Sequence, residues 1–303
     1  MRSGGSLVTR RAHAPGLGRR VLRLGVSTAL IGGCLVLGDT APAAAGPVPV
    51  MRGYVPLPAD ETQAVMELAN PAADTTLDFT VGITNAGNGS VMYYDHWEDG
   101  FEADLSNPVQ STTEVWGDGN TANGDASDYC STCSGDLLTP GDVFVIRNTI
   151  STPRNPSQIR FDGRDKVAST RGFAITAGGF STPLGSVLSA SASAYDTSKY
   201  GTAYVAPVGE DTGTPAGGSP PFETSSLVVM ASQDNTTVRV DTDADGTTDL
   251  TQTIDEGEVV FAGGGVLQGA TVTSDKPVQV QEGTGDVGAA YESRWFTLFP
   301  TNL

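Results

Sequence analysis

Residues 77–84 read Leu77-Asp-Phe-Thr-Val-Gly-Ile-Thr84, a stretch in which apolar and polar side chains alternate. Alternation with period two is typical of a β-strand that has one buried and one exposed face. The turn-forming segment 85–90 follows, and residues 91–97, Val-Met-Tyr-Tyr-Asp-His-Trp, are largely apolar again. The sequence therefore predicts a β-hairpin over 77–97.

Short strand-like runs separated by Gly, Asp, Asn and Pro continue along the chain, with no sustained helical period between them. The single predicted helix covers 60–69, with Asp60 as N-cap and Gln63 bonding back to it. The small residues of 185–194 fit either a strand or a connection between two lobes. The pattern predicts an all-β, antiparallel β-sandwich architecture with two lobes, 46–195 and 196–303. The further predicted strands cover 143–150, 166–176, 200–205, 227–231, 237–240, 250–254, 259–262, 270–273, 278–281 and 294–299.

Composition supports this fold class. The 303 residues include 38 Gly and 18 Pro, which leaves little room for long helices and argues against a helical bundle. The 38% hydrophobic content is sufficient for a core, so wholesale disorder is disfavoured.

The first 45 residues are predicted to be a cleaved signal peptide. Arginines cluster between Arg2 and Arg23, a short apolar run follows, and Ala-Pro-Ala-Ala-Ala-Gly at 41–46 contains small residues at signal-peptidase spacing. Arg19-Arg20 leaves both the Sec and the twin-arginine routes open. Ile31-Gly-Gly-Cys34 resembles a lipoprotein box, although the apolar run continues past Cys34. We therefore expect a secreted or cell-surface protein without a transmembrane span.

Removal of residues 1–45 makes the protein still more acidic. The formal net charge of the whole chain is −18, and all the clustered arginines lie in the predicted signal peptide. The remaining residues carry 11 basic and 34 acidic groups, a net charge of −23, with His96 as their only histidine. Nucleic acid is therefore excluded as a partner, because little here could replace phosphate counterions.

The segment Asp241-Thr-Asp-Ala-Asp-Gly-Thr-Thr-Asp249 is the most specific local motif. Carboxylates at loop positions 1, 3, 5 and 9, Gly246 at position 6 and the Thr247 carbonyl at position 7 match the front of a Ca²⁺ loop. Position 12 is Gln252 rather than glutamate, and β-strands flank the loop. The interpretations are a calcium-binding β-hairpin loop or an Asp-Gly turn in an acidic protein. The expected Ca²⁺ ligands are Asp241, Asp243, Asp245, Thr247 and Asp249.

A second acidic segment, 95–104, contains His96 and two aromatic residues. A pair of its carboxylates could act as acid and base on a glycosidic bond beside a stacking tryptophan, or the segment could hold a metal or another ligand. The structural alternative is that aromatic residues pack inward and the acidic residues form a turn. The candidate ligand cluster consists of Asp95, His96, Trp97, Glu98, Asp99 and Glu102.

Cys130 and Cys133 lie in a Gly- and Asp-rich loop. A zinc site would need further Cys or His ligands, and redox catalysis would need a strand-to-helix setting. In an exported protein the spacing instead predicts a local disulfide between Cys130 and Cys133.

Several short motifs recur in an order that resembles a known family. They are similar to the N-terminal region of large bacterial surface proteins related to the IgGFc-binding protein N-terminal domain, over most of 54–300. The motifs are Tyr94-Asp-His-Trp-Glu-Asp-Gly100, Phe161-Asp-Gly-Arg-Asp-Lys166, Tyr195-Asp-Thr-Ser-Lys-Tyr-Gly-Thr202, Ala231-Ser-Gln-Asp-Asn-Thr-Thr-Val238, Thr273-Ser-Asp-Lys-Pro-Val278 and Tyr291-Glu-Ser-Arg-Trp-Phe-Thr297.

The resemblance implies a β-rich extracellular module without a catalytic site, and further domains of the same polypeptide downstream. We therefore expect a non-catalytic module for adhesion or envelope architecture, stabilised by Ca²⁺, that forms the N-terminal part of a larger protein. Its expected partner is an extracellular protein or glycan. The alternative is a carbohydrate-binding module or glycoside hydrolase that uses the 95–104 segment.

Overall fold

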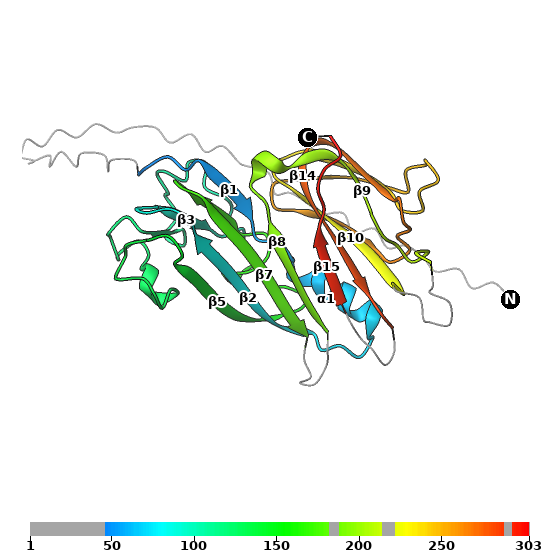
Figure 1. Cartoon of the computed structure of the whole chain (residues 1–303), viewed down its shortest axis with the longest axis horizontal. Helices are drawn as coiled ribbons and strands as arrows, with labels where there is room; N and C mark the ends of the chain where they lie inside the picture. Colours follow the sequence, from blue (N-terminus) through cyan, green and yellow to red (C-terminus); the bar gives the residue numbers. More distant parts are fainter. Residues whose placement is uncertain (1–45, 182–187, 214–221, 288–292, 303) are drawn as a thin grey trace, which may run out of the picture. The chain divides into compact units, whose positions relative to one another are not determined.

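The computed structural model describes residues 46–181, 188–213, 222–287 and 293–302. The predicted signal peptide lies outside these residues. The described part folds into three antiparallel sheets with one α-helix, so the all-β, antiparallel prediction is confirmed (Figure 1). Among these residues, no helix is long and apolar enough to cross a membrane.

The stretch 77–84 lies at the centre of the second sheet. Its strand, β2 (Thr76–Asn85), pairs with β5 (Val143–Ser151) on one side and β7 (Phe173–Ser181) on the other. β8 (Ser189–Ala194) pairs with β7 and completes the order β5-β2-β7-β8, so this part of 185–194 is a strand, while 185–187 lie outside the described residues. The predicted alternation is confirmed, because the apolar residues of β2 are buried and the polar ones alternate with them. The buried apolar residues are Leu77, Phe79, Val81 and Ile83.

The predicted hairpin over 77–97 is wrong. β3 (Met92–Asp95) pairs with β6 (Lys166–Ser169) and β4 (Glu114–Trp116) in a different sheet, which β1 (Met51–Tyr54) completes in the order β1-β6-β3-β4. The Asn85 amide donates to the carbonyls of Gly87 and Thr139 at 2.7 and 2.8 Å, which anchors the turn to a distant segment. Tertiary contacts thus direct the chain into the facing sheet rather than back along β2.

The third sheet contains the remaining strands. Its longest strand, β14 (Thr271–Gly285), joins the predicted strands 270–273 and 278–281 into one. Pro277 falls between the part of β14 that pairs with β11 and the part that pairs with β10, where the missing N–H costs no ladder bond. The order is β12-β11-β14-β10-β13, and β9 and β15 also pair with β14. The other strands are β9 (Gly201–Val205), β10 (Thr224–Ala231), β11 (Thr236–Asp241), β12 (Leu250–Ile254), β13 (Val259–Gly263) and β15 (Ser293–Thr297).

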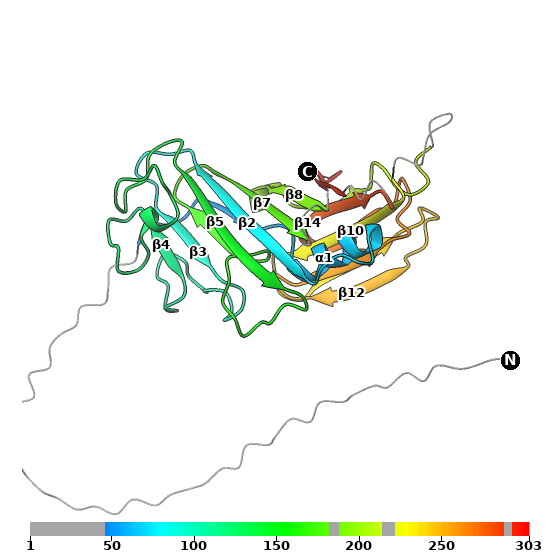
Figure 2. The ribbon, with the colours of Figure 1, turned by 90° about the horizontal axis from the view of Figure 1, so that it is seen from below.

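The predicted helix is confirmed as α1 (Ala59–Ala69), which lies against strands of the third sheet (Figure 2). Its predicted capping is wrong, because Pro58 occupies the N-cap position and makes no side-chain cap bond. The Asp60 carboxylate instead accepts from the Arg154 N–H at 2.7 Å. Gln63 donates to Glu67, at 3.3 Å. Two short 3₁₀ helices, η1 (Ala126–Asp128) and η2 (Thr197–Lys199), complete the elements.

The first and second sheets pack face to face and share a core with α1, so this part of the chain is a β-sandwich. Val228 and Trp295 of the third sheet belong to the same core, and a second apolar cluster lies within the third sheet. Strands of the first two sheets come from 51–194 and those of the third from 201–297. The division into lobes at residue 195 stays a prediction.

Candidate functional site

The acidic segment 95–104 begins where β3 ends, and its first residue is buried. Asp95 is opposite Lys166 in the β3–β6 pairing, and the Lys166 ammonium lies 3.4 Å from the Asp95 carboxylate. The same carboxylate accepts from the Glu102 N–H at 3.0 Å. Burial raises the pKa of Asp95 to about 6, although the charge of Lys166 opposes the shift. Asp95 therefore ties the end of β3 to β6 and to the following turn.

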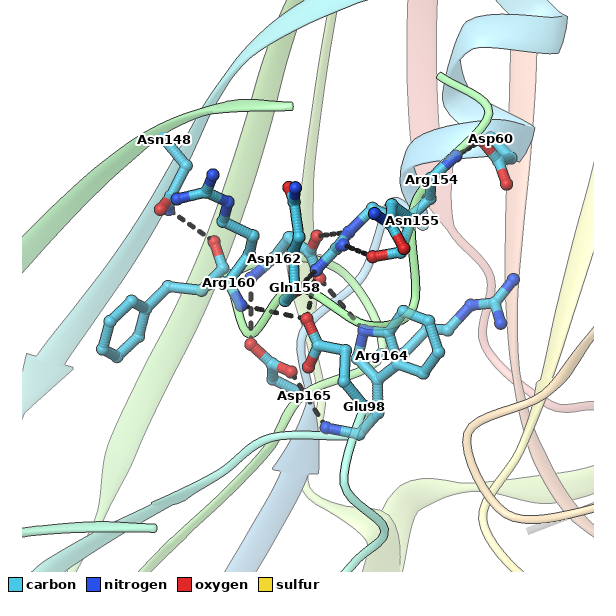
Figure 3. A network of polar contacts seen from close by, with 12 residues as sticks. Asp60, Glu98, Asn148, Arg154, Asn155, Gln158, Arg160, Asp162, Arg164 and Asp165 are labelled. Carbon is cyan, nitrogen blue, oxygen red and sulfur yellow. Dashed lines mark hydrogen bonds and ion pairs between the residues drawn. The ribbon is translucent and has the colours of Figure 1, made fainter. Parts of the chain in front are cut away.

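Arg154 connects this segment to a loop far away in the sequence. Its Nε donates to Asp162 at 2.5 Å, its Nη2 donates to Glu98, and the side chains of all three residues are almost fully buried (Figure 3). Nη2 also donates to the Gln158 carbonyl at 2.8 Å. Burial, together with the charge of Asp165, raises the pKa of Glu98 to about 7, against the effect of Arg154. Burial also raises the pKa of Asp162.

His96 and Asp165 form the other half of this network. The His96 Nδ1 lies 3.0 Å from the Arg160 carbonyl oxygen and 3.5 Å from the Asp165 carboxylate. Because both neighbours are acceptors, Nδ1 carries a proton. Burial lowers the pKa of His96, because it disfavours the charged ring. The hydrogen bond to Asp165 and the negative charge of Asp165 have the larger, opposite effect and raise the pKa of His96 to about 9. The Asp165 carboxylate also accepts from the Tyr94 hydroxyl at 2.7 Å.

Ligand atoms of His96, Glu98 and Asp165 lie within 4.8 Å of one another, a spacing that could hold a metal ion. A metal bound at Nδ1 would need the lone pair of a neutral imidazole at that nitrogen, whereas Nδ1 faces two acceptors and carries a proton. The geometry of His96 and Asp165 therefore fits a hydrogen-bonded histidine–carboxyl pair better than a metal site.

Trp97 takes part in the same network. Its indole Nε1 donates to Asp162 at 3.1 Å, and the guanidinium carbons of Arg154 and Arg164 lie 5.5 and 5.0 Å from its ring centroid. A small pocket of about 240 Å³ adjoins the indole and is lined by both arginines. Because cations already contact the ring, it is a poor platform for a sugar.

The remaining predicted ligands in this segment hold turns. Glu102 accepts from the N–H groups of Val109 and Gln110 at 2.7 and 2.6 Å. Asp99 accepts from the Thr112 hydroxyl. The structure thus brings Asp95, His96, Trp97 and Glu98 into contact with distant segments, while Glu102 bonds nearby residues, and all of them act as acceptors or donors in bonds that stabilise the fold. This favours the structural interpretation over acid–base catalysis.

The Asp-rich loop connects β11 to β12, as expected. Carboxylate oxygens of Asp241, Asp243 and Asp249 lie within 4.8 Å of one another. Asp241 is only 8% exposed; its Oδ2 accepts from the Gly246 N–H at 2.9 Å, while its buried Oδ1 has no hydrogen-bond partner among the described residues. The Asp249 Oδ2 accepts from the N–H and hydroxyl of Thr242, at 2.8 and 2.7 Å. The loop thus presents converging oxygens, of which one is buried and free.

Asp245 is not one of the converging residues. Its Oδ1 accepts from the Thr247 N–H at 2.6 Å, within the loop. Gly246 has a φ of +87°, a conformation that glycine adopts readily, and Ala244 also adopts a left-handed φ of +59°. Such a φ is uncommon for a residue with a Cβ, so the loop conformation is closely specified. Oxygen donors in a tight loop are the ligands that Ca²⁺ prefers.

The predicted disulfide is confirmed. Cys130 and Cys133 are joined at an S–S distance of 2.07 Å. Between them, the Thr132 hydroxyl donates to Asp142 at 2.9 Å, which anchors the small ring to the start of β5.

Several residues of the buried network carried no sequence signal for a role. Arg154, Asp162 and Asp165 are far from segment 95–104 in sequence and meet it only in the fold, and Glu256 is connected to it through Lys166. The motif Phe161-Asp-Gly-Arg-Asp-Lys166 is the one signal that could have pointed to Asp162 and Asp165, because it concentrates charge at the start of β6.

The fold and the sites define an acidic, antiparallel β module with a buried polar network and an Asp-rich loop of converging carboxylates. Residues 190–293 match the family model described as IgGFc binding protein. The chain is therefore related to the IgGFc-binding family through this segment, which contains the Asp-rich loop and nearly all of the third sheet. No curated protein and no solved structure matches the chain. The family description is that of a binding protein, and the 95–104 segment lies outside the match.

Proposed function

We propose that this protein is an exported, non-catalytic β module for adhesion or envelope architecture, and that Ca²⁺ stabilises it. The match of residues 190–293 to a family of binding proteins supports a binding role. The signal-peptide pattern of residues 1–45 supports export, and the engagement of the 95–104 carboxylates in structural bonds supports the absence of catalysis.

The observation that carries the calcium part is the environment of Asp241. A carboxylate oxygen that is buried without a hydrogen bond is costly, and the proximity of the Asp243 and Asp249 oxygens adds like-charge repulsion. A divalent cation between the three carboxylates would remove both costs. Backbone carbonyls of the loop could supply further oxygen ligands, and Ca²⁺ tolerates the irregular geometry that such a loop offers better than Mg²⁺ does.

Calorimetric titration of the chelator-treated protein with CaCl₂ tests this proposal. We expect saturable heat and a melting temperature that rises with Ca²⁺ concentration, because the ion binds only the folded state. Asp243→Asn should abolish both effects. The exposed Asp243 carboxylate accepts from the Asp245 N–H, and an amide oxygen can replace it in that bond. Asp275→Asn is the matched control, because Asp275 also accepts a backbone N–H, from Thr237, but lies outside the loop. Absence of heat and of a thermal shift at millimolar CaCl₂ would overturn the calcium proposal.

A panel of polysaccharides tests the non-catalytic part. We expect no release of reducing ends from any member. Turnover that disappears in Glu98→Gln would establish the glycoside hydrolase alternative instead, because Glu98 is the carboxylate of segment 95–104 whose raised pKa best suits an acid.

A further inference from the structure

A second cavity, distinct from the Asp-rich loop and from the Arg154 network, lies between the first and third sheets. It has a volume of about 790 Å³, within the range of ligand-binding clefts. One wall comes from β1, η2 and the loop after β3. The other wall comes from turns of the third sheet that contain Asp234, Glu256 and Pro277. Because the two walls belong to different sheets, a ligand here would contact both parts of the fold.

The floor of the cleft is made of buried side chains that are already paired. Lys166 is only 8% exposed at its side chain, and its ammonium lies 3.1 Å from the Glu256 carboxylate and 4.3 Å from the Phe101 ring centroid. The Tyr54 hydroxyl donates to the same Glu256 oxygen, and the Tyr54 ring packs edge-on against Phe101. The floor is therefore preorganised, with the Phe101 ring in contact with both Tyr54 and the Lys166 ammonium.

The rim, in contrast, offers unused acceptors. Asp234 uses Oδ1 to accept from the Glu256 N–H at 3.1 Å, and Glu256 uses Oε1 for Tyr54 and Lys166. Among the described residues, Asp234 Oδ2 and Glu256 Oε2 have no hydrogen-bond partner. Asp196 adds a third carboxylate beside the exposed side chain of Arg52, whose backbone N–H it accepts at 2.9 Å.

Among the described residues that line the cleft, Arg52 is the basic residue besides the buried Lys166, and Lys276, outside the lining, donates to the backbone carbonyls of Asp234 and Asn235. The Arg52 guanidinium makes no ion pair or hydrogen bond within the described part of the chain, and its side chain is exposed. The rim thus combines free carboxylate oxygens from one wall with free guanidinium donors from the other. This pattern is complementary to a polypeptide, in which backbone carbonyls accept hydrogen bonds and basic side chains bind carboxylates.

We propose that this cleft binds an extended segment of a partner protein that carries Lys or Arg side chains. A basic side chain would lie between Asp234 and Glu256, and Arg52 would donate to the segment's backbone carbonyls. The inference rests on the proposed binding function and names its ligand class.

The charge of the site and of the whole chain favours a basic partner. Carboxylates outnumber basic groups in the lining, with Glu102, Asp196, Asp234 and Glu256 against Arg52 and Lys166. Residues 46–303 carry 34 acidic and 11 basic groups, so a positively charged segment would also be steered toward the protein. An anionic ligand would meet net repulsion, and a sugar would have to share the Phe101 ring with Tyr54 and Lys166, which already contact it.

The test uses the peptide acetyl-Ala-Arg-Ala-Arg-Ala-amide and its Gln counterpart, titrated into the full chain at low ionic strength and followed by calorimetry and amide chemical shifts. We expect the Arg peptide to bind, with shifts concentrated at Ser198, Gln233 and neighbouring amides. Asp234→Asn and Glu256→Gln retain the acceptor oxygens that the fold uses, and each should weaken binding about two- to fivefold. Asp78→Asn, which removes an exposed carboxylate from the second sheet, is the matched control and should leave affinity unchanged.

Three outcomes would overturn the proposal. They are equal binding of the Arg and Gln peptides, equal weakening by the Asp78 and Asp234 variants, and absence of binding at millimolar peptide. Loss of peptide binding with intact Ca²⁺ heat would remove the cleft proposal alone. Loss of Ca²⁺ heat with intact peptide binding would remove the calcium proposal alone. Binding of a neutral oligosaccharide with shifts at Gln233 would assign the cleft to a glycan instead.

Discussion

Lys166 and Glu256 form an ion pair of 3.1 Å although they stand 90 residues apart and belong to different sheets. Lys166 begins β6 of the first sheet, and Glu256 lies in the turn between β12 and β13 of the third. The same ammonium is 3.4 Å from Asp95, whose side chain is fully buried. One cation therefore compensates a buried carboxylate and connects two sheets.

Lys166→Met should destabilise the protein strongly. It leaves Asp95 buried without its cation, and breaking such a pair from one side costs about 3–5 kcal/mol. The cost should be smaller at about pH 5 than at pH 8, because the pKa of Asp95, already raised to about 6, allows the unpaired carboxyl to become neutral. Denaturant unfolding at both pH values measures this difference. Glu256→Gln is the comparison and should cost less, since Glu256 is partly exposed and Gln retains Oε1. If it destabilises the protein as much as Lys166→Met does, the compensation of the buried Asp95 is not the main role of Lys166.

Thermal stability should fall as pH rises from about 6 to 9.5. The pKa of His96 is raised to about 9, so its stabilising charge is fully present below its unfolded pKa and is lost as pH rises through 9. The pKa of Glu98 is raised to about 7, so its contribution is likewise lost as pH rises through 7. Because both pKa values are raised in the folded protein, both groups lower the stability as pH rises. Together they should lower the free energy of unfolding by on the order of 2 kcal/mol.

Melting temperatures measured across this pH range, alongside His96→Gln, test the assignment. The variant should lose the part of the slope that lies above about pH 7, because it has no imidazolium to deprotonate. If the melting temperature of His96→Gln depends on pH in the same way as that of the original protein, a group other than His96 is responsible for the dependence. The pKa of Asp142 is lowered from its ordinary value of 3.8, so this carboxyl titrates only in acid and does not change the stability between pH 6 and 9.5.

Gly163→Ala should disrupt the loop that carries Asp162 and Asp165. A Cβ at this position would lie 2.4 Å from the Leu57 carbonyl oxygen and 2.6 Å from the Pro58 nitrogen, and backbone atoms cannot rotate away. We expect a loss of about 1–3 kcal/mol, as for other overpacked sites, in denaturant unfolding. Gly82→Ala is the control, because its Cβ would approach nothing closer than 3.5 Å; a similar loss in both variants would show that the contact with Leu57 is unimportant.

Removal of the disulfide should have only a modest effect. Cys130 and Cys133 close a ring with a sequence separation of 3, and the entropy that so small a ring removes from the unfolded chain corresponds to about 2 kcal/mol at most. The doubly substituted Cys130→Ala/Cys133→Ala protein should therefore remain folded, with a slightly lower melting temperature. Complete unfolding of this variant would mean that the disulfide determines more of the loop than local ring closure explains.

Local patterns in the sequence predicted most of the elements but not all of their partners. The alternation from Leu77 to Ile83 identified β2, yet the adjacent Val91–Trp97 run was assigned to the same hairpin rather than to the facing sheet. A hairpin with β2 and a strand in the facing sheet would both bury the apolar residues of 91–97. The hydrophobic pattern alone therefore could not distinguish these two pairings. The bonds of Asn85 to the carbonyls of Gly87 and Thr139, which decide the path of the chain, depend on a segment more than fifty residues away.

The sequence by itself determined the fold class, the Cys130–Cys133 pair and the Asp241–Asp249 loop, because side-chain alternation, ring size and turn chemistry are local properties. Tertiary structure alone decided what the acidic residues do. Glu98 meets Arg154 and His96 meets Asp165 across loops, and Asp95 meets Lys166 across two paired strands, and no short window of sequence contains any of these pairs. Burial raises the pKa values of Asp95 and Glu98, whereas Asp165 raises that of His96 against the effect of burial. The fold also brings the free acceptors of Asp234 and Glu256 into the same cleft as Arg52.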